Sequence, residues 1–290
     1  MQLLHVSVGG YSWIDWVLEP DVLLLCLALA AAYYYVVVRL RERISDAGRV
    51  RRSQVVTFSL GILMIYAAAG SPMHELADTY LASAHMLQHI LLMLAAAPLL
   101  LAGTPVWVWQ ALLRKPEVMR VARILTHPVM ALAVFNAVFL LTHLPTAVDA
   151  QLQHGWFHLL VHASQVGAGL LLWWPILSNV PELPRLSYPV QMGYLFVQSL
   201  LPMVFASFII FADSVFYSYY ETAPRLWNIS PIDDQQVAGL IMKLLGSVIL
   251  WVFIAVAFFR WYQEEQSKEA QGLHWDEVAE ELEELGLTRR

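Results

Sequence analysis

Long apolar runs separated by short polar segments dominate this chain. A helix needs about 20 apolar residues to cross the hydrocarbon core of a bilayer. Because backbone groups in lipid must be paired within their own segment, each such run predicts a membrane-spanning helix. Seven runs qualify: Asp21–Val38, Gln54–Gly70, Ala82–Ala102, His127–His143, Trp156–Leu177, Pro189–Ala212 and Val237–Phe259.

The pattern changes after the seventh run. Trp275, Val278, Leu282 and Leu285 recur at helical spacing among many glutamates, which predicts a short amphipathic helix. We therefore expect an all-α protein, with a seven-span membrane domain at residues 1–262 and an acidic amphipathic tail at residues 263–290.

Composition supports the membrane assignment. Hydrophobic residues make up 59% of the 290 residues and charged residues 14%, whereas about a quarter of a soluble protein is charged. The net charge of −6 comes mostly from the tail, which holds nine acidic and four basic residues after position 259. Cys26 is the single cysteine, which excludes an intramolecular disulfide and a thiolate cluster.

Basic residues predict the orientation, because loops rich in Lys and Arg stay in the cytoplasm. Fifteen of the 17 Lys and Arg residues follow the first, third, fifth and seventh runs, while Arg225 lies on the opposite side and Lys243 within the seventh run. The amino terminus is therefore expected outside and the carboxyl terminus in the cytoplasm. This bias also accounts for the basic residues without any nucleic-acid partner.

Histidines gather at one predicted depth. His85 and His89 lie at the start of the third run, His158 and His162 at the start of the fifth, and His143 at the end of the fourth. A spacing of four puts both members of a pair on one helix face. Because ionisable groups inside a membrane helix are costly and usually functional, we expect the five rings to form one ligand set near the outer face.

The residues around the first pair indicate which ligand is expected. Neutral imidazole is the commonest metal ligand. Met86 and Met93 flank the pair, and thioethers together with imidazoles favour copper. Zinc would also accept three imidazoles. The alternative is that the histidines bond to neighbouring carbonyls and help helices associate, with the methionines filling space in the core.

Several stretches of the chain resemble the CtaG family, the polytopic cytochrome c oxidase assembly factors of bacteria. Residues 85–93 read His-Met-Leu-Gln-His-Ile-Leu-Leu-Met, and residues 142–145 read Thr-His-Leu-Pro. Residues 158–162 with 173–175, and the Asp-Gln-Gln-Val-Ala-Gly-Leu-Ile-Met stretch at 234–242, also match. The resemblance covers most of the third to seventh runs.

The resemblance implies a membrane assembly factor, not an enzyme, that helps to mature a haem–copper oxidase in the bacterial inner membrane. It would bind copper, as Cu⁺, and pass it to oxidase subunits, with an outer-face copper carrier as a further partner. The matching positions include the five histidines, Asp234 and Met242. Lys243 departs from the family pattern, where an apolar or aromatic residue is expected.

Two other functions remain open on the residues alone. Histidines at this depth could hold a haem between two rings. Three histidines with an open position could instead serve a metal-dependent membrane enzyme.

Other polar and aromatic residues carry weaker expectations. Glu75 and Asp78 precede His85 and could hydrogen-bond the second nitrogen of a ligand. Lys243 would fit a retinal Schiff base, but the third run has no acidic counter-ion. We expect this lysine to extend outwards or to pair with Asp233 or Asp234. Four aromatic residues fit an interfacial belt, namely Tyr217, Tyr219, Tyr220 and Trp227.

Overall fold

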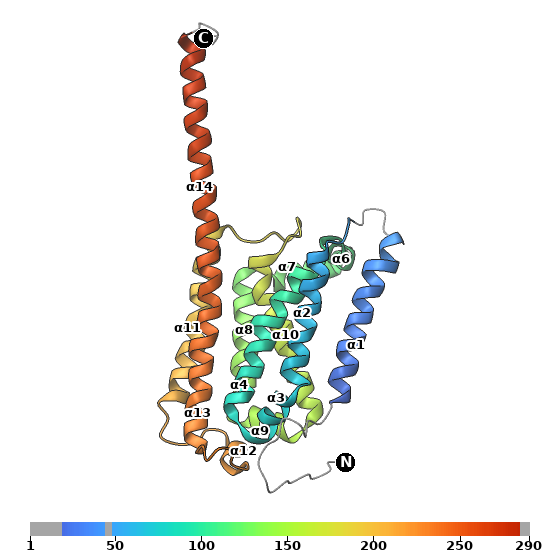
Figure 1. The fold of residues 1–290 in the computed structure, drawn as a ribbon, viewed down its shortest axis with the longest axis vertical. Helices are drawn as coiled ribbons and strands as arrows, with labels where there is room; N and C mark the ends of the chain where they lie inside the picture. The colour runs from blue at the N-terminus through green and yellow to red at the C-terminus, as the bar shows by residue number, and fades with distance from the viewer. Residues whose placement is uncertain (1–18, 44–47, 285–290) are drawn as a thin grey trace.

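The computed structural model describes residues 19–43 and 48–284, and all regular secondary structure within these ranges is helical. Long helices lie side by side in a bundle, and α14 extends far beyond it (Figure 1). The expected all-α class is confirmed.

Six helical segments are long and apolar enough to cross a membrane. In two of them a short π-helical turn joins two α-helices into one continuous segment. The six are α1 with η1 and η2 (Pro20–Arg43), α2 with α3 and η3 (Arg52–Tyr80), α4 with η4 and α5 (Ala82–Gly103), α10 (Gly155–Leu177), α11 (Tyr188–Ile210), and α13 with η5 and part of α14 (Pro231–Glu269).

The fourth expected span is shorter than its apolar run. It corresponds to α8 (Pro128–Thr142), whose 15 residues reach only about 22 Å at 1.5 Å per residue. The preceding helix α7 (Pro116–Leu125) is bent from α8 by 73°, with Pro128 starting the new helix. The bundle therefore has six candidate spans, or seven if this bent pair counts as one.

The tail does not form a separate short helix. Helix α14 (Gly246–Glu284) continues without a break through residue 262, the expected domain boundary. Helix-forming glutamates, glutamines and alanines after the apolar run explain why the helix continues. Val278 is half-buried and Leu282 exposed, whereas Leu285 and the Trp275 side chain lie outside the described residues.

The two ends of the bundle differ in character (Figure 1). The short helices α3 (Pro72–Glu75), α9 (Pro145–Gln153) and α12 (Ser218–Thr222) gather at one end, which we call the histidine end. At the opposite end lie α6 (Val106–Leu112) and α7. The segments there carry Arg114, Lys115, Arg120 and Arg123, so we call it the basic end.

Burial is inverted relative to a soluble protein. Large apolar side chains are exposed along α11 and α14, among them Phe208 and Val252, while glutamines and histidines are buried. An apolar exterior is what lipid tails require, and polar groups inside must then find partners within the bundle.

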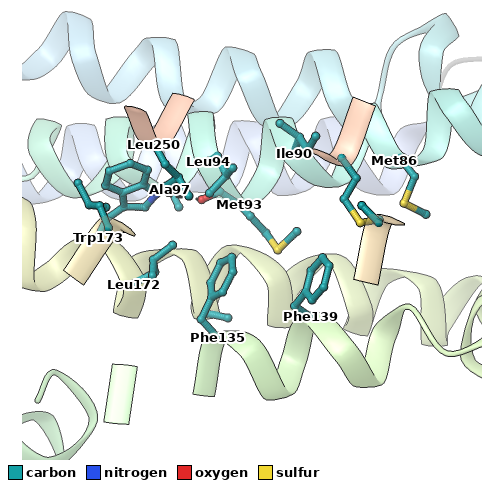
Figure 2. Packing of buried hydrophobic residues seen from close by; sticks show 14 of the residues in the cluster. Met86, Ile90, Met93, Leu94, Ala97, Phe135, Phe139, Leu172, Trp173 and Leu250 are labelled. Atoms are coloured by element: carbon teal, nitrogen blue, oxygen red, sulfur yellow. Dashed lines mark hydrogen bonds between the residues drawn. The ribbon is translucent and has the colours of Figure 1, made fainter. Parts of the chain in front are cut away.

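Helix α4 and its continuation run through the centre of the core. Figure 2 shows Met93 directed towards Phe135 and Phe139 of α8. Trp173 of α10 belongs to the same core cluster and packs against the central helix. The Trp173 indole Nε1–H donates to the Met93 carbonyl at 3.1 Å. A Cβ on Gly169 would lie 2.7 Å from that same carbonyl oxygen, so the glycine permits close contact between α10 and the central helix.

We expect Gly169→Ala to destabilise the protein, because the added methyl group meets backbone that cannot yield. Overpacking of this kind costs about 1–3 kcal/mol. Gly167→Ala on the same helix is the matched control, since nothing lies within 4 Å of its Cβ position and alanine favours helix. Thermal unfolding in detergent should show a lower midpoint for Gly169→Ala alone; equal midpoints would contradict the close approach.

Candidate metal centre

Five imidazole rings meet in one buried group at the histidine end, which we call the histidine cluster. Ring centroids lie 4.3 Å apart for His85 and His89 and 4.2 Å apart for His158 and His162. His85 lies 5.7 Å from His158, and His89 lies 5.7 Å from His162 and 5.0 Å from His143. Three helices, α4, α8 and α10, thus contribute to one group, as the sequence predicted.

Asp234 of α13 (Pro231–Leu240) fixes the helix that carries the first pair. Its carboxylate accepts from the Ala82 amide at 2.6 Å, the Ser83 amide at 3.2 Å and the Ser83 hydroxyl at 2.5 Å. These are the first residues of α4 (Ala82–Ile90), whose preceding residue Leu81 makes no side-chain cap. The carboxylate therefore supplies the missing cap from a distant helix. Its negative charge also lies at the positive end of the α4 helix dipole, which stabilises the start of that helix.

Hydrogen bonds orient the ring of His143, which follows the last residue of α8. Its Nδ1 lies 2.7 Å from the Phe139 carbonyl, and a carbonyl only accepts, so Nδ1 carries the hydrogen. In the neutral ring, Nε2 is then an acceptor, and it faces His89 Nδ1 at 3.3 Å. The Tyr217 hydroxyl donates to the His143 carbonyl at 3.3 Å, which ties the end of α8 to the loop before α12.

A carboxylate orients the ring of His158. Asp78 Oδ2 lies 3.0 Å from His158 Nδ1 and 3.5 Å from His74 Nε2. His158 Nε2 faces His162 Nε2 at 2.9 Å. One ring of the cluster is thus held between a carboxylate on one side and a second imidazole on the other.

Several buried polar atoms of this region have no hydrogen-bond partner within the described part of the chain. Both ring nitrogens of His85 are unpartnered, although the residue is fully buried. His89 Nε2 and Gln88 Oε1 are likewise unpartnered, as are both side-chain polar atoms of Gln165. Each such atom costs about 1–3 kcal/mol, so their accumulation at one place points to a ligand.

The two predicted methionines lie in the apolar core. Met86 is 1% exposed and Met93 4%, and both belong to the large hydrophobic cluster with Ile90 and Phe139. Figure 2 shows the Met93 thioether next to phenylalanine rings. Their role as ligands remains a prediction, and packing accounts for their burial.

The expected pairing of Lys243 with Asp233 or Asp234 is wrong, and so is the lipid-facing position expected of Tyr217 and Tyr220, two of the four belt residues. Lys243 Nζ donates to the Ser207 hydroxyl of α11 at 3.2 Å and forms no ion pair within the described residues; Asp234 instead caps α4. Tyr217 and Tyr220 are 1% and 2% exposed, so they lie inside the histidine end and not in a lipid-facing belt. Tertiary packing decided both cases.

Tyr220 lies beside the cluster at the histidine end. Its ring centroid lies 6.2 Å from that of His85, and its hydroxyl donates to the Ala77 carbonyl at 2.5 Å. Burial raises the pKa of Tyr220 well above its ordinary value, and the carboxylates of Asp78 and Asp234 raise that pKa further. The phenol therefore keeps its proton and remains a donor.

Sequence reasoning missed three polar residues of the site. His74 lies outside the seven expected runs, yet its ring lies 5.4 Å from that of His158. Gln88 donates to His74 Nδ1 at 2.9 Å and to the Ala68 carbonyl at 3.0 Å. The spacing of His74 and Asp78, the place of Gln88 between two histidines and that of Gln165 three residues after His162 were the available signals.

Fold and site together define a helical membrane protein with a buried polar cluster at one end of its bundle. The family model for the cytochrome c oxidase caa3 assembly factor (Caa3_CtaG) matches residues 31–264. This chain belongs to that family, which is a family of assembly factors and not a class of enzymes. Comparisons with curated proteins and with solved structures return no match.

We expect Asp234→Ala to destabilise the protein by roughly 1–3 kcal/mol, because three donors at the start of α4 lose their acceptor. Asp233→Ala is the control, since among the described residues that exposed carboxylate accepts a hydrogen bond from the nearby Ser230 hydroxyl alone. The unfolding midpoint in detergent should fall for Asp234→Ala and stay near wild type for Asp233→Ala. Equal effects would show that the cap does not hold α4.

Proposed function

We propose that the protein binds copper at the histidine cluster and hands it to a subunit of the oxidase that it helps to assemble. The observation that carries this proposal is the unpartnered, fully buried ring of His85 among four further imidazoles. Imidazole is a ligand for copper without requiring a buried negative charge. Family membership supplies the process, oxidase assembly.

The spacing of ring nitrogens supports ligation by pairs. His158 Nε2 and His162 Nε2 lie 2.9 Å apart, and His89 Nδ1 and His143 Nε2 lie 3.3 Å apart. Two imidazole nitrogens at 2.0–2.1 Å from a tetrahedral ion would be separated by about 3.3 Å. Small ring rotations would therefore place either pair on one ion, and the other rings would complete its shell.

Hand-over requires exchangeable ligands. Neutral imidazoles provide them, because no thiolate anchors the ion and the single cysteine lies in a separate apolar cluster with Phe58 and Ile65. We propose Cu⁺ as the cargo, an outer-face carrier as its donor and oxidase subunits as its acceptor.

We further propose a seven-span topology in the bacterial inner membrane, with α7 and α8 forming the bent fourth span. The amino terminus and the histidine end would face outward, and α14 would end in the cytoplasm. The concentration of Lys and Arg at the basic end supports this orientation through the positive-inside rule.

Purified wild-type protein should contain copper that is lost in the His85→Ala/His89→Ala double variant, because four of the ring nitrogens disappear. Oxidase maturation in cells should fall with it. Metal analysis of the detergent-purified protein and oxidase activity of membranes provide the measurements. His154→Ala is the control, since the side chain of this exposed histidine at the same end contacts the Ala150 carbonyl and no other hydrogen-bond partner among the described residues.

Unchanged copper and oxidase activity in the double variant would refute the proposal. An optical spectrum of the same samples separates haem from copper. A Soret band that disappears with these two substitutions would indicate a haem protein instead.

The topology can be tested with single cysteines in a Cys26→Ser background. Glu221 and Glu117 are both exposed, at the histidine end and the basic end respectively. A membrane-impermeant maleimide should label Glu221→Cys in intact spheroplasts and Glu117→Cys only after lysis. The reverse pattern would invert the proposed orientation, and labelling of both in intact spheroplasts would refute the arrangement.

A further inference from the structure

A second set of possible ligands lies beside the histidine cluster. Within the described residues, His74, Asp78 and His158 form a group whose ligand atoms all lie within 4.8 Å of one another. We call this group the His–Asp–His triad. It combines side chains of α3, η3 (Leu76–Tyr80) and α10, so tertiary structure brings these atoms together.

We propose that the His–Asp–His triad is a separate binding site for a divalent transition-metal ion, and that it shares His158 with the histidine cluster. Two imidazoles and one carboxylate with an open fourth position form a ligand set that Zn²⁺ accepts. The negative charge of Asp78 favours a divalent ion over Cu⁺, which softer ligands select.

Unpartnered acceptors around the triad support the proposal that a cation binds there. Asp78 Oδ1 is buried without a hydrogen-bond partner within the described residues, and so is Gln88 Oε1 beside His74. A carboxylate and an amide oxygen without donors are costly. A bound ion would supply positive charge to the first of these atoms.

Proton positions allow the change from hydrogen bonds to metal bonds. In the metal-free arrangement, His158 Nδ1–H donates to Asp78 at 3.0 Å, and His74 Nε2 faces the same carboxylate at 3.5 Å. Metal at these nitrogens moves each ring proton to the other nitrogen of the same ring. His162 Nε2 lies 2.9 Å from His158 Nε2, and Gln88 Oε1 belongs to the amide that contacts His74 Nδ1. In neutral rings the metal-free contact is His162 Nε2–H donating to His158 Nε2, so His162 must move its own hydrogen to Nδ1 before its Nε2 can accept from His158. The Gln88 amide must likewise turn so that Oε1 faces His74 Nδ1–H, which gives up its bond to the Ala68 carbonyl. Each ring then still carries one hydrogen, so no net proton is released.

Exposure increases from the cluster to the triad. The side chains of Asp78 and His74 are 27% and 15% exposed, whereas His85 and His89 are 0% and 1% exposed. His158 joins the two sites, with Nδ1 towards the triad and Nε2 towards the cluster. The triad is therefore the more accessible of the two sites. Its relation to the cluster rests on the proposed copper function, but the existence of the triad site does not.

The test uses full-length protein in detergent, titrated separately with Zn²⁺ and with Cu⁺ under competition from a chelator. His74→Ala and Asp78→Asn should each lower Zn²⁺ affinity at least about tenfold and leave the Cu⁺ stoichiometry unchanged. His85→Ala/His89→Ala should lower the Cu⁺ stoichiometry and leave the Zn²⁺ affinity unchanged. Glu221→Gln, an exposed carboxylate at the same end, is the control and should change neither, and unfolding midpoints identify any variant that fails to fold.

Unchanged Zn²⁺ affinity in both triad variants would overturn the inference and leave Asp78 as a hydrogen-bond partner of His158. Parallel loss of Zn²⁺ and Cu⁺ in His74→Ala, or loss of Zn²⁺ in the double cluster variant, would also overturn it by showing one shared site. If Zn²⁺ depends on the triad while Cu⁺ binding is absent or independent of the cluster, the proposed function fails and the triad site stands.

Discussion

The structure depends on one constraint: polar groups inside a lipid-facing bundle must find partners within the bundle. Many polar groups of the histidine end find such partners. Asp234 satisfies the amides that begin α4, and the Phe139 carbonyl holds one nitrogen of His143. The rings then bond to one another, as His158 does to His162. Where this pairing stops, at His85, the unsatisfied nitrogens mark the place where a ligand would bind.

Packing of the apolar core sets the geometry of the polar end. The central helix is held by α10 through Gly169 and by α2 through Gly103, where a Cβ would lie 2.4 Å from the Phe58 amide nitrogen. Such contacts fix the height of α4 relative to α10. The two histidine pairs therefore meet at one level, with ring separations of 5.7 Å between the helices. The glycines lie away from the cluster, and the close contacts that they permit help to hold the helix that carries His85 and His89.

The features that could be predicted from the sequence are those set by the spacing of residues within one helix. Apolar runs predicted the spans, and the spacing of four predicted that His85 and His89 share a face, as do His158 and His162. The partners could not be predicted in the same way. Asp234 lies 152 residues from Ala82, and nothing in the sequence near Lys243 identifies Ser207.

Segments between apolar runs misled the sequence reasoning for a related reason. The second run ends at Gly70, so His74 fell outside the expected spans and Asp78 was expected only to support a ligand. In the structure, Ser71 caps a new helical turn, and the chain continues as helix to Tyr80. This extension carries both side chains back against α10. A composition-based boundary cannot detect it, because the cap and the contact with His158 compensate for the polar residues.

The shared ring of His158 connects the proposed function with the proposed triad site. A protein that hands over a metal ion must hold it firmly enough to accept it and loosely enough to release it. A divalent ion in the triad and copper in the cluster would use opposite nitrogens of the His158 ring, so occupation of one site places the ring proton on the nitrogen that serves the other. The two sites then compete for His158, and an ion in either is bound less tightly when the other is filled. Such competition would favour release, which a closed site with four fixed ligands would oppose.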